Sequence, residues 1–271
     1  MTTSKTKEFQ ELIWDYYHDN ARDMPWREDP NPYGVVVSEV MLQQTQVSRV
    51  MEKFPEFVGR FDGFMSLAQA SPADVITVWQ GLGYNRRALN LHRLAKMVVD
   101  EYGGELPSDP SDLVKLPGIG PGTAGSIAAF AFDAPVVFIE TNIRRVFIHH
   151  FFEDREGVDD KELMPLVEEA LDKEHPREWY YALMDYGTYL AKTVPNPNRR
   201  SRHHTRQSKF EGSDRQIRGA ILRALVNEKL PFEALFEHIE CSDRERFEHA
   251  LRGVVKDGLV ELHKNYYQLP R

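Results

Sequence analysis

Two carboxylates stand at positions where a carboxylate could do chemistry. Glu39 is the lone charge in the apolar run 35–42, where burial would raise its proton affinity and suit it to proton transfer. Glu140 follows the apolar run 135–139 and stands at the expected start of a helix over 143–151, where a carboxylate could act in catalysis. The alternatives without catalysis are that Glu39 lies at the solvent-exposed edge of a core helix, and that Glu140 caps a helix and stabilises it by about 0.3–1 kcal/mol.

A glycine-rich turn, residues 116–125, lies between these two carboxylates in the chain. A short helix over 111–116 and a helix of small residues over 123–132 flank it, which predicts a helix-hairpin-helix. Glycines there can take positive φ and leave no side chain between backbone and ligand, so the amides can face an anion. The candidate residues are Gly118, Gly120, Gly122 and Thr123. We expect the anion to be a DNA phosphate; the alternative is a helical corner without a ligand.

Two further segments suit contacts with a nucleic-acid backbone. The loop 81–87 combines two glycines, an aromatic ring and two arginines, and its candidate residues are Tyr84, Asn85, Arg86 and Arg87. The segment 194–209 holds the densest basic stretch, with Arg199, Arg200 and Arg202 as candidate phosphate contacts. A solvated turn and a solvated linker are the alternatives. His203 and His204 lack nearby cysteines and a clear acidic partner, so we expect no metal site.

The composition restricts the remaining possibilities. A net charge of −8 over 271 residues argues against a uniformly basic surface, so a nucleic-acid face must come from local clusters of Lys and Arg. The single cysteine, Cys241, excludes an internal disulfide and any cluster held by several thiolates. The apolar runs are too short for a membrane span, and the segment 1–5 lacks a signal-peptide core. We therefore expect a cytoplasmic, nucleoid-associated monomer.

Apolar periodicity predicts an all-α chain that ends in a small winged-helix-like domain. Helices are expected at 9–17, 33–42, 54–61, 64–70, 71–82, 86–102, 111–116, 123–132, 143–151, 161–174 and 176–189. In the last domain, helices are expected at 215–226, 232–239 and 243–257, with a wing hairpin of 259–262 and 266–269. Since its third helix mixes both signs of charge, this domain could bind DNA, bind a protein or brace its neighbour.

Several motifs, in this order, resemble those of the adenine DNA glycosylase (MutY) branch of the helix-hairpin-helix DNA glycosylases. They are Met24-Pro-Trp-Arg27, Ser38-Glu-Val-Met-Leu-Gln-Gln-Thr-Gln-Val47, Trp79-Gln-Gly-Leu-Gly-Tyr84, Leu116-Pro-Gly-Ile-Gly120 with Thr123-Ala-Gly125, and Leu183-Met-Asp-Tyr-Gly187. The resemblance implies a two-lobed all-α fold that binds DNA and flips the target base out of the stack, where its glycosidic bond becomes accessible.

The resemblance also implies a domain division. Residues 1–212 would form the glycosylase domain, with a six-helix lobe over about 31–133 and a second lobe from 1–30 plus 134–212. Residues 213–271 would form the winged-helix-like domain.

The family's functional residues map onto this chain one at a time. Glu39 matches the general acid that protonates the departing base, and Gln43 and Gln44 match amides that work at the opened base stack. Glu140 stands where the family has an aspartate that stabilises the positive charge on the sugar. Gly122 stands where bifunctional relatives carry the lysine that attacks the sugar, which implies a monofunctional hydrolase.

The chain departs from the family pattern in four places. Glu140 adds a methylene to the family's aspartate, and Asn85 replaces a tyrosine that often acts as a wedge. The segment 190–209 lacks the four cysteines that hold an iron–sulfur cluster, so we expect no cofactor. The large C-terminal module with which many adenine glycosylases read 8-oxoguanine has no counterpart in residues 213–271.

The sequence therefore predicts a monofunctional, clusterless DNA glycosylase that removes adenine opposite guanine or 8-oxoguanine. Excision of T or U opposite G is the alternative substrate. A catalytically inactive, structure-specific DNA-binding protein is the alternative from another class. The pair Glu39 and Glu140 favours the enzyme, because a protein that only binds phosphates has no need of two carboxylates beside them.

Gly122 generates the first prediction. Borohydride traps a Schiff base between a lysine and an abasic sugar, so the native chain should give no covalent protein–DNA adduct on a denaturing gel. The Gly122→Lys variant is the positive comparison, because it restores an amine at that position. Efficient trapping by the native chain would refute the monofunctional assignment.

Overall fold

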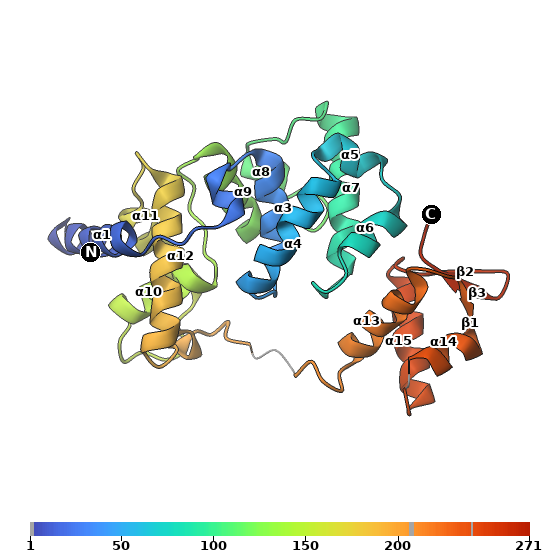
Figure 1. Ribbon diagram of the computed structural model, residues 1–271. Coiled ribbons are helices and arrows are strands. Elements are labelled where there is room, and N and C mark those ends of the chain that lie inside the picture. The colour runs from blue at the N-terminus through green and yellow to red at the C-terminus, as the bar shows by residue number, and fades with distance from the viewer. Residues whose placement is uncertain (1–2, 206–208, 240) are drawn as a thin grey trace. The chain divides into compact units, whose positions relative to one another are not determined.

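The computed structural model describes residues 3–205, 209–239 and 241–271, and these residues are mostly helical (Figure 1). This confirms the all-α class with a small C-terminal sheet. Arg206, within the basic segment of the sequence, lies outside the described residues. Among the residues described, none of the helices combines the length and the apolar character that crossing a bilayer requires.

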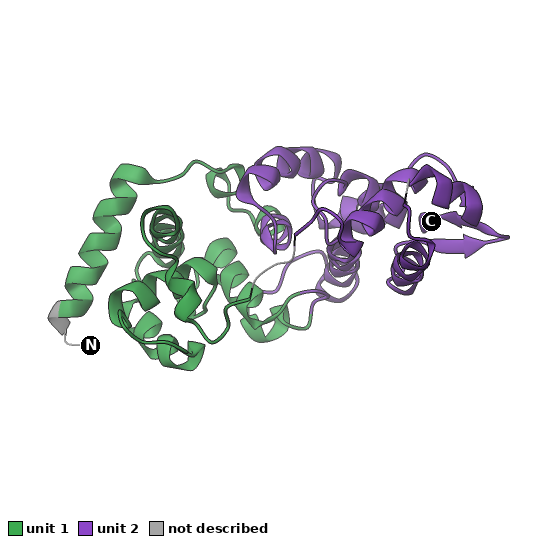
Figure 2. Ribbon diagram, turned by 90° about the horizontal axis from the view of Figure 1, so that it is seen from below, with its two compact units in different colours: residues 1–35, 108–115, 119–206 green, residues 36–107, 116–118, 207–271 purple. Residues whose placement is uncertain are grey.

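The chain folds into two compact units, coloured separately in Figure 2. Unit 1 comprises residues 1–35, 108–115 and 119–206, and unit 2 comprises 36–107, 116–118 and 207–271. The winged-helix-like segment therefore belongs to the same unit as the helices of residues 36–107 instead of standing alone. The expected boundary at residue 212 remains a prediction.

Unit 1 contains the chain's first helices and most of its middle part. Its elements are α1 (Thr3–Asn20), α2 (Pro25–Glu28), α8 (Pro110–Leu113), α9 (Pro121–Phe132), α10 (Thr141–Phe151), α11 (Asp160–Ala170), α12 (Pro176–Thr193) and the 3-10 helix η1 (Pro197–Arg200). The helix α2 occupies a segment where the sequence indicates only a break, because Pro25 at the first helical position supports one short turn.

Unit 2 joins a helical bundle to the winged-helix-like module. Its elements are most of α3 (Pro32–Leu42), α4 (Val47–Arg60), α5 (Phe64–Gln69), α6 (Pro72–Val78), α7 (Arg86–Tyr102), α13 (Asp214–Leu225), α14 (Phe232–His238), α15 (Arg244–Lys256), β1 (Leu230–Pro231), β2 (Glu261–His263) and β3 (Tyr266–Gln268). The helix α4 begins well before the expected start at residue 54, since Pro55 is tolerated inside it.

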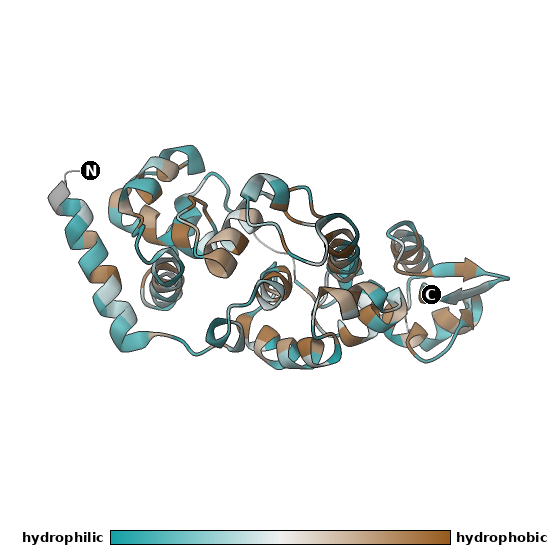
Figure 3. Ribbon diagram, turned by 90° about the horizontal axis from the view of Figure 1, so that it is seen from above, coloured by the Kyte–Doolittle hydropathy of each residue, from teal (hydrophilic) through white to brown (hydrophobic). Residues whose placement is uncertain are grey.

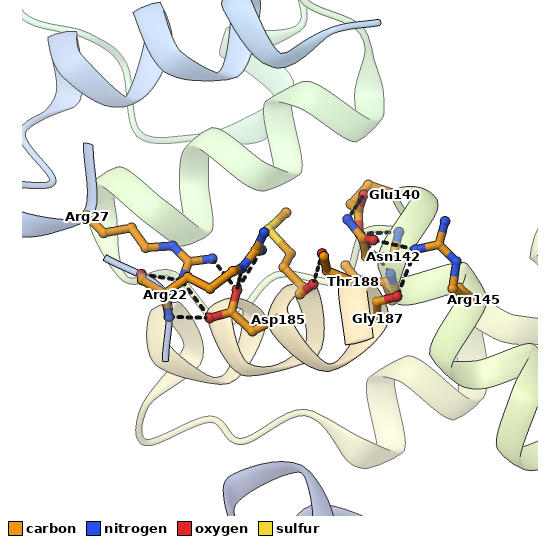
Figure 4. Close-up of polar contacts among 10 residues, drawn as sticks. Arg22, Arg27, Glu140, Asn142, Arg145, Asp185, Gly187 and Thr188 are labelled. Carbon is orange, nitrogen blue, oxygen red and sulfur yellow. Dashed lines mark hydrogen bonds and ion pairs between the residues drawn. The ribbon is translucent and has the colours of Figure 1, made fainter. Parts of the chain in front are cut away.

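A buried ion cluster ties the N-terminal segment of unit 1 to α12. The helix α1 is itself largely hydrophilic (Figure 3). Beyond it, Arg22 Nε lies 2.7 Å from Asp185 Oδ1, and Arg27 Nη2 lies 2.9 Å from the same oxygen (Figure 4). The Asp185 side chain is only 1% exposed, so these guanidinium groups offset a costly burial of charge. The Met-Pro-Trp-Arg and Leu-Met-Asp-Tyr-Gly motifs therefore meet in one contact.

The C-terminal module shares a hydrophobic core with the rest of unit 2. Its three strands lie in the order β1-β3-β2, and Lys264 and Asn265 take positive φ in the β2–β3 turn, as the predicted wing hairpin requires. The strand β1 is too short for a sequence pattern to indicate. Ile76 of α6 and Leu89 of α7 lie in one buried cluster with the module's apolar side chains, so the module packs on these helices.

His150 generates a pH prediction for unit 1. Burial, assisted by His149, lowers the pKa of His150 from 6.5 to about 4, so the folded chain binds this proton less tightly than the unfolded chain. Stability should therefore fall as pH drops from about 6.5 to about 4, by up to about 3 kcal/mol from this group. Urea unfolding followed by tryptophan fluorescence should show a shallower loss for His150→Gln. The exposed His263→Gln variant is the control, and equal slopes for His150→Gln and the native chain would contradict the prediction.

Candidate DNA-binding and catalytic site

The predicted hairpin forms between α8 and α9. Gly118 takes a φ of 83°, and a Cβ there would lie 3.0 Å from Asn90 Cβ, so both conformation and space require glycine. Gly120 has a φ of −92° and Gly122 lies within the helix α9. The expectation of positive φ is therefore correct for Gly118 and wrong for the other two glycines, whose contribution is the lack of a side chain.

The start of α9 is open to a ligand. Gly120, Pro121 and Gly122 are exposed, and a Cβ at Gly120 would meet no atom within 4 Å. Pro121 occupies the first helical position, where its missing N–H costs nothing. The helix has 12 residues, and its dipole and the backbone N–H groups of its first turn favour an anion at this end. Thr123 is partly buried in the same first turn.

Glu140 caps the N-terminus of α10. Its Oε1 accepts hydrogen bonds from the backbone N–H of Asn142 at 2.6 Å and of Ile143 at 2.8 Å, and its Oε2 accepts from Asn142 Nδ2 at 3.3 Å. Burial raises the pKa of Glu140, while the two backbone amides and the nearby Arg145 and Arg144 guanidinium groups oppose that rise. Glu140 therefore acts as a helix cap, as the alternative without catalysis expects. The cap also fixes the orientation of the carboxylate, and its three hydrogen bonds use fewer than the four lone-pair sites of the two oxygens.

Helix α12 fixes the position of this cap. A Cβ on Gly187 would lie 2.7 Å from Asn142 Cβ and 2.8 Å from Asn142 O, so only glycine permits this close crossing of α10 and α12. Arg145 Nη1 donates to Asn142 Oδ1 at 2.6 Å and to Gly187 O at 2.9 Å (Figure 4). The sequence gives no role to Gly187 or Arg145 beyond a motif match, because their partners lie more than 40 residues away.

The carboxylate and the hairpin are neighbours within unit 1. A Cβ on Gly122 would lie 3.6 Å from the carbonyl oxygen of Ile139, the residue that precedes Glu140. Gly125, one helical turn on, is in still closer contact, since its Cβ would lie 2.6 Å from Phe138 Cβ. The small residues of α9 therefore allow the run before Glu140 to pack directly against the helix that opens the anion site.

Glu39 lies on α3 in unit 2, so the two candidate catalytic carboxylates belong to different units. Its side chain is half-buried, whereas Ser38 at 1% and Val40 at 3% exposure are buried. The position fits both the proton-transfer interpretation and the wet edge of a core helix.

Gln43 and Gln44 form the turn that ends α3. Gln44 takes a φ of 58°, which strains a residue with a side chain, and it is exposed, while Gln43 is half-buried. Thr45 Oγ1 lies 3.5 Å from the carbonyl oxygen of Leu82. This contact brings the glutamine turn beside the loop 81–85, although the two are about 40 residues apart in sequence.

The loop before α7 presents Tyr84. Gly81 and Gly83 take φ values of 94° and 71°, and Tyr84 itself takes 45°, so three left-handed residues project the ring from the loop. The Tyr84 side chain is 39% exposed. Asn85 is the N-terminal cap residue of α7 and is half-buried, and Arg86 has a 67% exposed side chain.

Arg87 occupies a different place from the one expected of a DNA contact. The residue is only 9% exposed, and burial lowers its pKa to about 10, which leaves it charged at neutral pH. Its guanidinium donates to carbonyl or hydroxyl oxygens at 2.7–3.2 Å in Val40, Met41, Gln43, Thr45, Leu82 and Gly83. These bonds hold the glutamine turn and the Tyr84 loop together. We call these two segments the candidate DNA-reading surface, and Arg87 supports it from beneath.

The three arginines of the basic segment have different surroundings. Arg199 is exposed. Arg200 donates to the carbonyl oxygens of Phe152 and Glu153, the two residues that follow α10, so it stabilises the turn after this helix. Arg202 Nη1 lies 3.4 Å from Asp159 Oδ2 with a 73% exposed side chain. Only Arg199 and Arg202 therefore keep the exposure that the predicted phosphate contacts need.

Metal and cluster ligation depends on residues that this region does not supply. The iron–sulfur cluster implied by the family requires four cysteine thiolates, and the chain's only cysteine, Cys241, lies between α14 and α15. In its place, Asn198 Nδ2 donates to Thr141 O at 2.9 Å. His203 Nε2 lies 3.7 Å from Asp159 Oδ1, and within the described ranges no three His, Cys, Asp or Glu side chains gather as a metal site.

Comparison with known proteins gives concordant similarities. The pattern "HhH-GPD superfamily base excision DNA repair protein" matches residues 37–173. The adenine DNA glycosylase of Mycolicibacterium smegmatis is 33% identical over 268 residues, 92% of this chain and 91% of that protein. The adenine DNA glycosylase of Buchnera aphidicola subsp. Schizaphis graminum is 34% identical over 70% of this chain, which spans only 55% of that protein's length. A solved thermostable thymine-DNA glycosylase is 25% identical, with a TM-score of 0.64 over 70% of this chain and 89% of its own.

The basic segment generates a prediction that separates its arginines. Arg199→Ala should weaken binding to duplexes of any sequence and reduce the slope of log K against log salt by about 1, because one phosphate contact is lost. Arg200→Ala should instead lower the free energy of unfolding by about 1–3 kcal/mol, because two carbonyls in the turn after α10 lose their donor. Fluorescence anisotropy at several salt concentrations and urea unfolding measure the two effects. If Arg199→Ala leaves the salt slope unchanged, the segment is a linker.

Proposed function

Because the chain belongs to the HhH-GPD superfamily of base excision DNA repair proteins, we propose that it hydrolyses the N-glycosidic bond of adenine mispaired with guanine or 8-oxoguanine. It would act as a monomer on nucleoid DNA in the cytoplasm. The adenine DNA glycosylases among its relatives and the five adenine-branch motifs support adenine as the target. Residues 213–271 form a small winged-helix-like module, and we propose that the chain prefers 8-oxoguanine over guanine less strongly than the family does.

The observation that carries this proposal is the placement of Glu140 behind the hairpin. The run ending at Ile139 packs on Gly122 in the first turn of α9, so a phosphate held at that turn brings the DNA strand toward the Glu140 carboxylate. The N-terminal cap holds that carboxylate in one orientation through Asn142 and Ile143. A fixed negative charge there stabilises the positive charge that develops on the sugar as the glycosidic bond breaks.

Glu39 completes the proposed chemistry. Adenine leaves poorly as an anion, so its departure needs protonation at a ring nitrogen, and the half-buried Glu39 of α3 is the proposed donor. Water then attacks the sugar and supplies the hydroxyl group, and its other proton returns Glu39 to the acid form. The free base leaves as the neutral molecule. With Gly122 at the position of the family's lysine, the reaction proceeds without a covalent enzyme intermediate. It also needs no iron–sulfur cluster.

A second substrate class has its own support. The solved structure of a thymine-DNA glycosylase resembles this chain, and Asn85 replaces the tyrosine typical of the adenine branch. Thymine or uracil leaves more readily as a stabilised anion, so its excision depends on hydrogen bonds to its oxygens more than on a proton donor. Excision of T or U opposite G is therefore the alternative.

An oligonucleotide panel tests the proposal. Duplexes carry A opposite G or 8-oxoguanine, T or U opposite G, and hypoxanthine, and hot alkali cleaves the strand at each abasic site. The native chain should release adenine, and both Glu39→Gln and Glu140→Gln should bind the duplex but lose turnover. An amide can neither donate a proton as an acid nor balance a cationic sugar, and the loss should be about 100-fold or more.

Two controls accompany these variants. Asp243→Asn removes another N-terminal cap carboxylate, since Asp243 accepts from the Arg246 N–H at 3.0 Å, and it should retain activity. Glu101→Gln changes an exposed glutamate on α7 and should also remain active. Full activity of Glu140→Gln would contradict a catalytic role for Glu140 and leave it only the role of a helix cap. Excision of T or U opposite G, with no release of adenine opposite G or 8-oxoguanine, would contradict the adenine assignment.

A further inference from the structure

Tyr84 contacts a residue from the far end of the chain. Arg215, in the first turn of α13, places Nη1 2.9 Å from the Tyr84 hydroxyl oxygen and its Cζ 5.4 Å from the ring centroid. Arg87 lies 5.8 Å from the same ring centroid and donates through Nε to Tyr84 O at 3.4 Å. The ring of a strained loop residue therefore lies within reach of two guanidinium groups, one from its own loop and one from the C-terminal module.

The C-terminal module is anchored on the helix that follows this loop. Leu89 of α7 is part of the module's buried core, and Gly258, with a φ of 73°, would place a Cβ 3.7 Å from Arg93 Nη2. Arg86 Nη1 lies 4.0 Å from Asp257 Oδ1. The module therefore contacts α7 through apolar and charged groups close to Tyr84.

The arginines of α15 pair with carboxylates of the same module. Arg244 pairs with Glu233, Arg246 pairs with Asp214, and both lie on α15, the helix that reads DNA in DNA-binding winged helices. Arg252 Nη1 also lies 3.5 Å from Glu248 Oε2. Of the three roles that the sequence leaves open for this module, bracing its neighbour agrees best with these pairings.

We propose that Arg215 is a positioning residue through which the C-terminal module sets the orientation of Tyr84, and thereby the preference of the chain for mispaired over matched DNA. The hydrogen bond fixes the outer end of the ring, while the Arg87 bonds fix the backbone of the loop. A ring held at both ends enters a disrupted base stack without first losing conformational freedom. The proposal rests on the proposed function only in taking a mispaired duplex as the ligand.

A double-mutant cycle on DNA binding tests the proposal. Kd is measured by fluorescence anisotropy for Arg215→Ala, Tyr84→Phe and the double variant, with one duplex holding A opposite G and one matched duplex. Each single variant should weaken binding to the mispair by about threefold to tenfold and leave the matched duplex nearly unchanged, because one charge-assisted hydrogen bond is lost. The double variant should be no weaker than the worse single variant, because both remove the same contact.

Three further variants separate positioning from other roles. Arg223→Ala removes an exposed arginine from the same helix and should leave both Kd values unchanged. Arg215→Lys keeps the charge and should recover part of the mispair preference. Gln216→Ala, next to Arg215 and exposed, controls for damage to the helix start. Melting temperatures of all variants show whether the module stays folded.

Each result supports or overturns the positioning role. Additive losses, or equal losses on both duplexes with a reduced salt slope, would make Arg215 a phosphate contact. Equal behaviour of Arg215→Ala and Arg223→Ala, or a native chain that does not distinguish the two duplexes, would also overturn the proposal. A native chain that prefers the mispair but excises no base from the panel refutes the proposed function alone, because the binding cycle does not depend on turnover.

Discussion

The buried guanidinium of Arg87 is the contact on which the candidate DNA-reading surface of unit 2 depends. Its donors reach the carbonyl oxygens of Val40, Met41 and Gln43 at the end of α3, and those of Leu82 and Gly83 in the loop before α7. Helix C-terminal carbonyls that lose their donor inside a protein are costly, so one side chain stabilises two turns at once. The strained backbone of Gln44 and Tyr84 persists because this network holds both turns.

In unit 1, a close crossing of α10 and α12 fixes the position of Glu140. Gly187 allows α12 to contact Asn142. Arg145 donates hydrogen bonds to the Asn142 side chain and to the Gly187 carbonyl oxygen, and Asn142 donates to Glu140. Two residues before Gly187 on α12, Asp185 accepts hydrogen bonds from Arg22 and Arg27. A single helix therefore anchors the N-terminal segment on one side and the candidate catalytic carboxylate on the other (Figure 4).

The segment after α12 forms its own hydrogen bonds where relatives of this family carry cluster cysteines. Asn198 donates to Thr141 at the start of α10, and Arg200 donates to Ile148 in its last turn and to Phe152 just after it, so the segment contacts both ends of that helix. Such contacts stabilise a loop without a metal, and they keep α10 fixed beneath Glu140. The absence of cluster cysteines is therefore compatible with an ordered helix behind the candidate catalytic Glu140.

The sequence by itself determined most of the helices, the hairpin and the family, because apolar periodicity, proline and glycine positions and motif order are local properties. It also determined that a four-cysteine cluster cannot form, since composition alone decides this. Only the tertiary structure decided which arginines face solvent: Arg87 and Arg200 read as phosphate contacts, but both are engaged with carbonyl oxygens remote in sequence. The same holds for Gly187 and for the contact between Arg215 and Tyr84, whose partners are 131 residues apart. A guanidinium satisfies carbonyls and phosphates with the same donors, so its role depends on which acceptors the fold brings near it.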